Sequence, residues 1–344
     1  MLNHNSFPIT SGLLSRGEAV DPDRNLLNRF NAHFKKIDEE LKKGFNSGIP
    51  LMYDIGIHAL LGSGKRLRPL LFVLSSKLCG YRRKDIYFFS TIFEYFHSAS
   101  LLHDDVIDNA ETRRNKPSAR SLWGNSAAVL TGDYLTSKAA GIALNVNNIN
   151  FLRVIINTGE RMSEGQFLEM SYTNEWKIGK DQYMEIITSK TAELMSAACA
   201  CGGIISDASE EDIQRLKDFG LNLGIAFQLV DDLLDYSSSE EELGKPSGKD
   251  LREGKTTLPL IYALSEMGED DIKRLENFFS NPRKDEEDYR KLLMTVKKSG
   301  AINRVREDAR DYATKASKFL DEFPASSYVE DLLALNEYIH SRNY

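Results

Sequence analysis

The sequence predicts an all-α protein, and two observations along its 344 residues lead to that prediction. Apolar residues recur at steps of three and four through most of the chain, which is the period of a helix with one buried side. No stretch of convincing length alternates apolar and polar residues, as a half-buried strand would. We therefore expect one large helical domain over residues 21–344, preceded by a disordered leader at residues 1–20.

The composition limits the binding partners and the cellular location that we expect for the protein. Hydrophobic residues make up 41% and charged residues 28%, as in an ordinary globular protein. The net charge of -7 gives no general attraction for nucleic acid. No segment approaches the roughly 18 apolar residues that a membrane-spanning helix needs, so we expect a cytoplasmic protein without a transmembrane segment. Three cysteines form no CxxC pair and are expected to be buried, reduced thiols: Cys79, Cys199 and Cys201.

The first predicted helical pattern begins at Asp21 and runs through residues 26–41. The next helical stretch leads to a basic cluster. Lys65, Arg66 and Arg68 follow a Gly-Ser-Gly break and surround the point where Pro69 suits the first turn of a helix. The free N–H groups and the dipole at a helix N-terminus favour an anion. A solvated basic surface is the alternative, because GSGK alone is not a phosphate-binding loop.

The following helix, predicted at residues 84–108, ends in a DDxxD motif. Its acids are Asp104, Asp105 and Asp108. They fall within about one helical turn, where like charges are costly unless a cation relieves them. A solvated acidic surface is the alternative for a single motif of this kind. The exit of the helix supplies Arg113 and Arg114, whose guanidinium groups suit the oxygens of a metal-bound diphosphate.

Further helices are expected between this motif and its second occurrence. One covers residues 126–144, another passes through Gly165, and a third begins near Lys190 and Thr191 and packs closely through small residues at 196–203. A Lys-Thr pair in a helix is, by itself, more typical of an ordinary surface.

The second DDxxD motif lies in the clearest predicted helix, at residues 212–236. Its polar side chains are Gln228, Asp231, Asp232 and Asp235. They recur at offsets of three, four and seven residues beside an apolar stripe, so they share one face of the helix. Repetition of the motif in the same apolar setting makes chance a poor explanation.

A loop rich in glycine and cations follows, GKPSGKDLREGKTTLPL, with Lys245, Lys249 and Lys255 close to the second motif. A lid over the site is one interpretation of this loop, and a plain connector is the other. Beyond Leu258 the chain is predicted to be helical to its end, and no residues there indicate chemistry.

These groups indicate a site for a diphosphate ester with a hydrocarbon tail. Mg²⁺ suits paired carboxylates and substrate phosphates because it prefers hard oxygen ligands. Zinc is disfavoured, since His97 and His103 lack partners at ligand spacing. When a diphosphate leaving group is neutralised, an allylic C–O bond can ionise, and an apolar cavity can protect the resulting cation from water.

The sequence resembles the trans-isoprenyl diphosphate (polyprenyl) synthases. The motifs GKRLRP, LLHDDVIDNAETRR, KTAEL, FQLVDDLLDY and GKPSGKDLREGKTTLPL stand in that family's order, together with the Glu164-Gly165-Gln166 trio. The resemblance implies an all-helical bundle around a deep central cavity, usually as a homodimer. It also implies head-to-tail condensation of isopentenyl diphosphate with an allylic diphosphate primer.

The resemblance also implies roles for individual residues. Three Mg²⁺ ions on the allylic diphosphate would be held by Asp104, Asp105, Asp108, Asp231, Asp232 and Asp235. The cationic partners of that diphosphate would be Arg113, Lys190, Lys245 and Lys255. The isopentenyl diphosphate would bind at Lys65, Arg68, His97 and Arg114. Oxygens of Thr191 and Gln228 would stabilise the carbocation, while Lys249 departs from the family pattern and is left out.

Product length is predicted from the residues that precede the first motif. Side chains on a helix lean towards its N-terminus, so Ala99 and Ser100 should line the cavity beneath the metals without blocking it. Small residues there go with long products in similar synthases, which predicts about C30 to C50. The floor of the cavity is expected at Phe93 or Phe96, or on a facing helix.

Three alternatives remain from the sequence. A short-chain farnesyl or geranylgeranyl diphosphate synthase would share the motifs and differ in product. A terpene cyclase would share the cation chemistry but would not need a second diphosphate site. A non-catalytic regulatory subunit of a two-component synthase would not be expected to keep both aspartate motifs. Peripheral membrane contact during product release is a further expectation.

Overall fold

The computed structural model describes residues 28–341 except 63, 115, 238–247, 282 and 284. The predicted leader and Lys245 lie outside the described residues, and the single domain over 21–344 stays a prediction. The all-α prediction is confirmed. The described strands are β1 (Thr112–Arg113) and β2 (Lys116–Pro117), a short antiparallel pair with Thr112 opposite Pro117.

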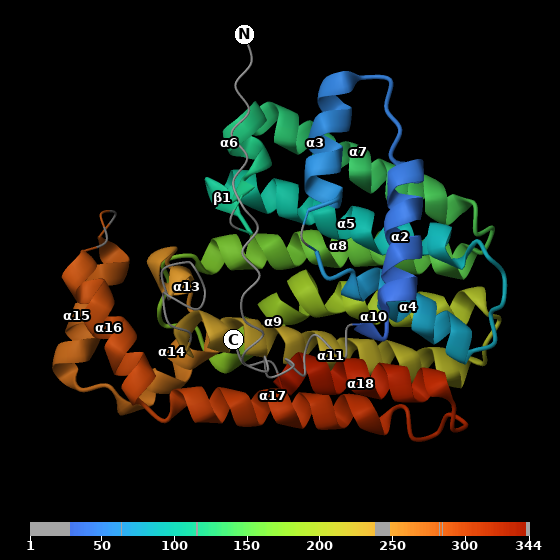
Figure 1. The fold of residues 1–344 in the computed structure, drawn as a ribbon. Helices are drawn as coiled ribbons and strands as arrows, with labels where there is room; N and C mark the ends of the chain where they lie inside the picture. Colours follow the sequence, from blue (N-terminus) through green and yellow to red (C-terminus); the bar gives the residue numbers. More distant parts are fainter. Residues whose placement is uncertain are drawn as a thin grey trace, which may run out of the picture.

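Helices of very different length make up the rest of the described structure (Figure 1). In chain order they are α2 (Asn31–Gly44), α3 (Pro50–Leu60), α4 (Leu67–Leu78), α5 (Ile86–Ile107), α6 (Ala119–Trp123), α7 (Asn125–Leu144), α8 (Ile149–Tyr172), α9 (Lys180–Ile187), the π-helix η1 (Thr188–Ala192), α10 (Glu193–Ile205), α11 (Glu210–Ser237), α13 (Lys249–Arg252), α14 (Leu258–Ala263), the 3₁₀ helix η2 (Leu264–Glu266), α15 (Glu269–Ser280), α16 (Glu286–Lys298), α17 (Ala301–Lys318) and α18 (Ser327–Ser341). No helix in this part of the chain is long and apolar enough to cross a bilayer.

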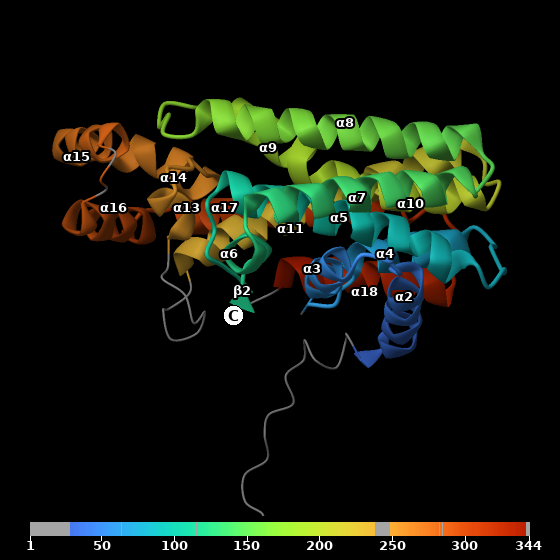
Figure 2. The same ribbon diagram turned by 90° about the horizontal axis from the view of Figure 1, so that it is seen from above.

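The long helices run across the molecule side by side. Seen from above, α8 lies along one side, followed by α7 and α5, with α2 and α3 on the opposite side (Figure 2). Helices α15 and α16 form a hairpin at the end that also holds α13 and α14 (Figures 1 and 2). The two DDxxD motifs lie at the C-terminal ends of two of these helices, α5 and α11.

The core consists of two groups of buried side chains. The larger group joins α4, α5, α8 and α10, where the ring of Phe72 lies 5.2 Å from that of Phe93 and 6.2 Å from that of Phe151. The smaller group joins α11 to α14–α17 and includes the fully buried Tyr236 and Leu292. These two groups hold α5 and α11 in place at the ends where their aspartates lie.

Two details differ from the sequence predictions. The helix expected to begin near Lys190 instead continues without a break from α9 through the π-helical turn η1 into α10. All three cysteines are free, and Cys199 and Cys201 are buried, but Cys79 is only half-buried because it follows α4 at the surface. Its expected burial was therefore wrong.

Candidate active site

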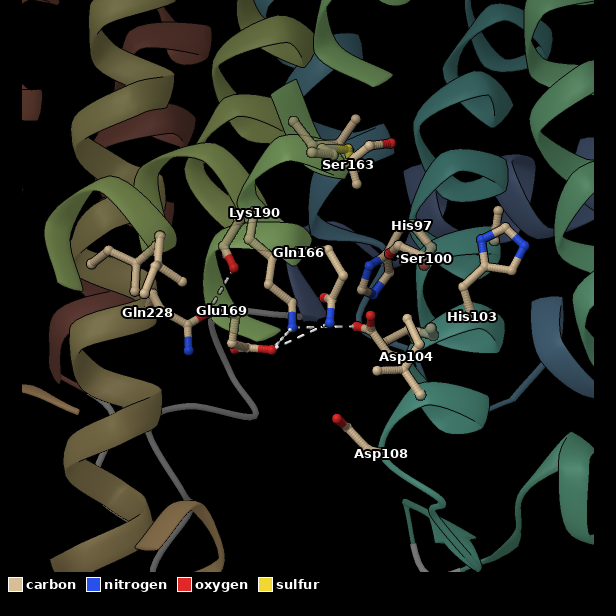
Figure 3. Close-up of a pocket in the computed structure, with 18 of the residues that line it drawn as sticks. His97, Ser100, His103, Asp104, Asp108, Ser163, Gln166, Glu169, Lys190 and Gln228 are labelled. Carbon is tan, nitrogen blue, oxygen red and sulfur yellow. Dashed lines mark hydrogen bonds and ion pairs between the residues drawn. The ribbon is translucent and has the colours of Figure 1, made fainter. Parts of the chain in front are cut away.

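A cavity of about 1590 Å³ opens between α5, α7, α8, η1 and α11, with residues of the α13 segment at its mouth. This exceeds the ordinary small-molecule pocket of about 300 to 1000 Å³. Four of the six motif aspartates line this cavity together with many apolar side chains: Asp104, Asp108, Asp231 and Asp232. Figure 3 shows Asp104 and Asp108 on α5 facing Glu169, Lys190 and Gln228 across this space.

The aspartates of the first DDxxD motif point to two different sides of the helix. Asp104 and Asp108 line the cavity. Asp105 is buried on the other side of α5, where its Oδ1 atom accepts from Nε and Nη2 of Arg113 at 2.8 and 2.6 Å. Burial raises the pKa of Asp104, and nearby Glu169 acts in the same direction, while Lys190 opposes them. Arg113 therefore holds Asp105 while it also lines the cavity.

Two lysines bridge the mouth through carboxylates. Lys190 Nζ lies 2.5 Å from Glu169 Oε2 and 3.8 Å from Asp104 Oδ2. Lys255 Nζ lies 3.1 Å from Asp108 Oδ2 and 3.9 Å from the same Glu169 oxygen. Although burial acts against it, the pKa of Lys255 is raised by the surrounding carboxylates, Glu169 first. Glu169 was missed by sequence analysis; its only signal is its place three residues after Gln166, on the same face of α8.

The second motif is tied to η1 and α9 by a chain of hydrogen bonds. Thr191 Oγ1 donates to Gln228 Oε1 at 3.0 Å, and Gln228 Nε2 donates to Asp232 Oδ1 at 2.7 Å. The hydroxyl of Tyr183 donates to the other oxygen of Asp232 at 2.6 Å. Burial nevertheless raises the pKa of Asp232 to about 7, with neighbouring Asp231 adding to the effect. The predicted pair Thr191 and Gln228 is thus brought together, and Tyr183 is an addition.

Asp235 differs from the other motif aspartates because its carboxylate binds backbone N–H groups. Its two carboxylate oxygens accept the backbone N–H groups of Lys249 and Asp250 at 3.1 and 2.9 Å, which fixes the first turn of α13. Asp250, which the sequence analysis left out of the site, lines the cavity instead, as does Asp231. Burial raises the pKa of Asp250, and Asp235 and Asp232 add to that shift.

The basic cluster lines the same cavity as the aspartates. Lys65, Arg68, His97 and Arg114 all line it. The Nε atom of Arg68 is buried without a hydrogen-bond partner among the described residues. Burial lowers the pKa of His97, helped by Arg68 and Arg114, so this imidazole is neutral. An anion at this position would supply the partner that Arg68 lacks.

Arg66 stabilises the basic cluster through ion pairs and does not belong to the predicted binding residues. It has left-handed backbone geometry with a φ of 50°, and its guanidinium donates to Glu94 Oε1 at 2.7 Å and to Asp38 Oδ1 at 2.9 Å. Lys65 Nζ is held by the hydroxyl of Tyr338, at 2.8 Å, on the last helix. The position of the cluster thus depends on distant parts of the chain that its local sequence does not indicate.

The apolar end of the cavity begins below Asp104. Ala99 and Ser100 line it, and so does Phe96, whose ring approaches α8 at Gly159. A Cβ atom on Gly159 would lie 3.1 Å from that ring, so Phe96 packs directly against the facing helix. Phe93, the other predicted floor residue, packs against Phe72 in the core instead.

The acids at the mouth offer oxygen donors only, which is the donor set that a hard divalent cation prefers. Within the described residues, no group of three or more acidic, histidine or cysteine side chains is close enough to hold a metal without help. Asp104 and Asp108 approach from α5, whereas Asp231 and Asp232 approach from α11. This arrangement fits a cation that completes its coordination with diphosphate oxygens between the two helices.

A helical bundle in which two aspartate motifs and a basic cluster line one apolar cavity fits the divalent-metal-dependent prenyltransferases. Comparison with known proteins identifies the family. The polyprenyl synthetase family model matches residues 49–296. The chain belongs to this family and is a prenyltransferase of the trans-polyprenyl diphosphate synthase type.

Individual relatives agree with this assignment. The chain is 34% identical over 303 residues to octaprenyl diphosphate synthase of Escherichia coli, covering 87% of this chain and 92% of that one. It is 36% identical to geranylgeranyl diphosphate synthase of Saccharolobus solfataricus, covering 87% and 92%. A polyprenyl synthase of Caulobacter crescentus, solved with calcium and isoprenyl diphosphate, superposes with a TM-score of 0.88 at 33% identity, covering 95% and 99%.

Proposed function

We propose that this enzyme condenses isopentenyl diphosphate head-to-tail with an allylic diphosphate and forms a long all-trans polyprenyl diphosphate. The observation that carries this proposal is that carboxylates of both motifs and a cluster of cations line one apolar cavity. Isopentenyl diphosphate would bind without metal at the basic cluster, at Lys65, Arg68, His97 and Arg114. The allylic diphosphate would bind the acidic mouth through bound Mg²⁺, for which we propose three ions.

The aspartates of both motifs would hold these ions, and a divalent cation there withdraws charge from the leaving diphosphate. Lys190 and Lys255, with Arg113 and Lys245, would contact the remaining oxygens once the metals occupy the carboxylates. The allylic C–O bond then breaks, and the Thr191 hydroxyl and Gln228 carbonyl oxygens stabilise the carbocation. The double bond of isopentenyl diphosphate forms the new C–C bond, and the released diphosphate accepts the proton that leaves.

The length of the product, about C30 to C50, follows from the size of the cavity and its small residues. Ala99 and Ser100 present little bulk one turn below Asp104, and Phe96 stands nearly one further turn down. The relatives include both a long-chain and a geranylgeranyl enzyme at similar identity, so sequence similarity does not decide the length.

An assay with radiolabelled isopentenyl diphosphate, farnesyl diphosphate and Mg²⁺ tests the function, with products separated by chromatography. Elongation to about C30 or longer is expected, and a Ser100→Phe variant should give shorter products because its ring would block the cavity. A product no longer than C20 would refute the long-chain assignment. A cyclic hydrocarbon, or no turnover, would refute the condensation itself.

We further propose a cytoplasmic homodimer that touches membrane lipid only to release product. Exposed apolar side chains on α7 and at the start of α8 offer a surface for a second copy: Leu130, Leu144 and Ile149. Light scattering should give the dimer mass for the wild type and the monomer mass for Leu130→Glu, since a buried unpaired charge opposes association. Addition of phospholipid vesicles should raise turnover if product release is limiting; an unchanged rate would refute the membrane contact.

A further inference from the structure

The π-helical turn η1 carries Lys190 and Thr191, and two glycines on neighbouring helices lie against its backbone. π-Turns are rare, and they persist where the surrounding structure stabilises them. Gly165 approaches η1 from α8, and Gly224 approaches it from α11. We propose that Gly165 and Gly224 are positioning residues: their missing side chains let α8 and α11 close on η1 and so place the Lys190 amine and the Thr191 hydroxyl in the cavity.

The distances on the α8 side leave no room for a side chain. A Cβ atom at Gly165 would lie 2.6 Å from the backbone nitrogen of Lys190, 3.0 Å from its Cα and 2.9 Å from Cβ of Ser189. Two of these three atoms belong to the main chain, so no side-chain rotation relieves the overlap. An alanine at this position must push η1 away from α8.

The α11 side has the same arrangement. A Cβ atom at Gly224 would lie 2.6 Å from Cα of Ala192, 2.9 Å from its Cβ and 3.2 Å from its carbonyl oxygen. Ala192 directly follows the Lys-Thr pair and is fully buried. The π-turn is therefore confined from two sides by close backbone contact.

Near each glycine, polar side chains one helical turn along the same helix form hydrogen bonds with η1. On α8, Arg161 Nη2 donates to Ser189 Oγ at 3.0 Å, and Glu169 accepts from Lys190. These residues stand four positions before and four after Gly165, on the same face of the helix. On α11, Gln228 stands four positions after Gly224 and accepts from Thr191 at 3.0 Å. Displacing either glycine contact would thus lengthen the bonds that orient the two reactive side chains.

The proposal rests on the proposed function for the roles of Lys190 and Thr191. The test compares Gly165→Ala and Gly224→Ala with Gly141→Ala. Gly141 lies in the exposed part of α7, and a Cβ atom there would have nothing within 4 Å. Each of these changes replaces glycine by the best helix former inside a helix, so propensity alone favours all three variants equally.

We expect kcat to fall about 10- to 100-fold in Gly165→Ala and Gly224→Ala, because misplacement of catalytic groups by about 1 Å costs this much. Gly141→Ala should stay within about twofold of the wild type. The KM for isopentenyl diphosphate should hold within about threefold, since its basic cluster lies on other elements. A kcat within threefold of the wild type in both variants would overturn the proposal.

A double-mutant cycle separates positioning from general damage to the fold. In a Lys190→Ala background, Gly165→Ala should cost less than about threefold, because the group that it displaces is already gone. The same cycle with Thr191→Val tests Gly224→Ala. Full additivity in both cycles would show that the glycines act through the fold at large and would overturn the positioning role.

Hydrogen exchange supplies a readout that does not depend on activity. Amides at residues 188–192 should exchange at least about tenfold faster in Gly165→Ala than in the wild type, whereas Gly141→Ala should leave them unchanged. If the wild type failed to elongate a primer, the proposed function would fall, and exchange would still decide whether Gly165 confines η1. Unchanged exchange in an active enzyme would overturn the glycine proposal alone.

Discussion

Two neighbouring arginines, Arg66 and Arg68, should respond to replacement by methionine with opposite effects on stability. Arg66 is buried and paired with Glu94 and Asp38. Arg68 is partly buried, and its Nε atom has no partner in the described part of the chain. Burial lowers the pKa of Arg68, an effect that Glu94 and Asp231 only oppose. The guanidinium of Arg66 is thus fully paired, whereas the Nε atom of Arg68 is, among the described residues, free to bind an anion.

For binding, the loss in Arg68→Met follows from the contacts that a guanidinium makes with a diphosphate. Two charge-assisted hydrogen bonds contribute about 1.5 to 3 kcal/mol each, so their removal costs about 3 to 6 kcal/mol. A tenfold change corresponds to about 1.4 kcal/mol, which gives a rise in the KM for isopentenyl diphosphate of about two to four orders of magnitude. The KM for the allylic primer should change by less than about threefold.

For stability, the ligand-free Arg68→Met variant should gain about 1 kcal/mol, because a buried unsatisfied donor is removed. Its melting temperature should rise by roughly 2 °C. Arg66→Met should lose about 3 to 5 kcal/mol, because it leaves buried Glu94 without its ion pair. Initial rates at saturating primer and thermal melts without ligand measure both effects. A clear fall in melting temperature for Arg68→Met, or a KM within threefold of the wild type, would refute the reasoning.

Three further predictions concern the mouth and the floor of the cavity. Because the pKa of Asp232 is raised to about 7, the native state keeps a proton that the unfolded chain releases near pH 4. In thermal melts with EDTA, the melting temperature of the wild type should therefore fall relative to that of Asp232→Asn as the pH rises from about 4 to 7. Melting temperatures that change with pH in parallel for the two proteins would contradict this. Phe96→Ala should lengthen the product, measured by chromatography, if the ring of Phe96 beside Gly159 forms the floor of the cavity; unchanged length would exclude Phe96 as the floor. Lys255→Ala should raise the KM for the allylic diphosphate at least about tenfold while leaving that for isopentenyl diphosphate unchanged, and an equal rise in both would contradict its place beside Asp108.

The sequence predicted those parts of the fold and site that depend on local pattern. Helical periodicity located α5 and α11 within two residues of their observed ends, because each buries a continuous apolar stripe. The same periodicity placed Asp104 and Asp108 on one face, and both line the cavity. Ala99 and Ser100 also line it, as the lean of helical side chains predicted.

The remaining features depend on contacts between distant segments. Nothing in the residues TSKTA distinguishes a π-turn from an α-helix, since the turn is confined by helices about 25 and 30 residues away in the chain. Glu169 resembles any acid on a helix until α8 packs against Lys190. Asp235 belongs to an apparently uniform motif, yet two backbone N–H groups from the α13 segment determine where its carboxylate lies.

The acidic and basic groups on the cavity differ in charge, and this difference supports the proposal that only one diphosphate binds through metals. Around Asp104 and Asp108, Lys190 and Lys255 each already have a carboxylate partner. A diphosphate is repelled there until cations occupy the acids and release the lysines. At the basic cluster, the Nε atom of Arg68 has no hydrogen-bond partner among the described residues and Glu94 is paired with Arg66, so a diphosphate meets positive charge there without a metal. Under the proposed function only the diphosphate held through metals would leave, because its C–O bond is allylic and divalent charge would neutralise that leaving group.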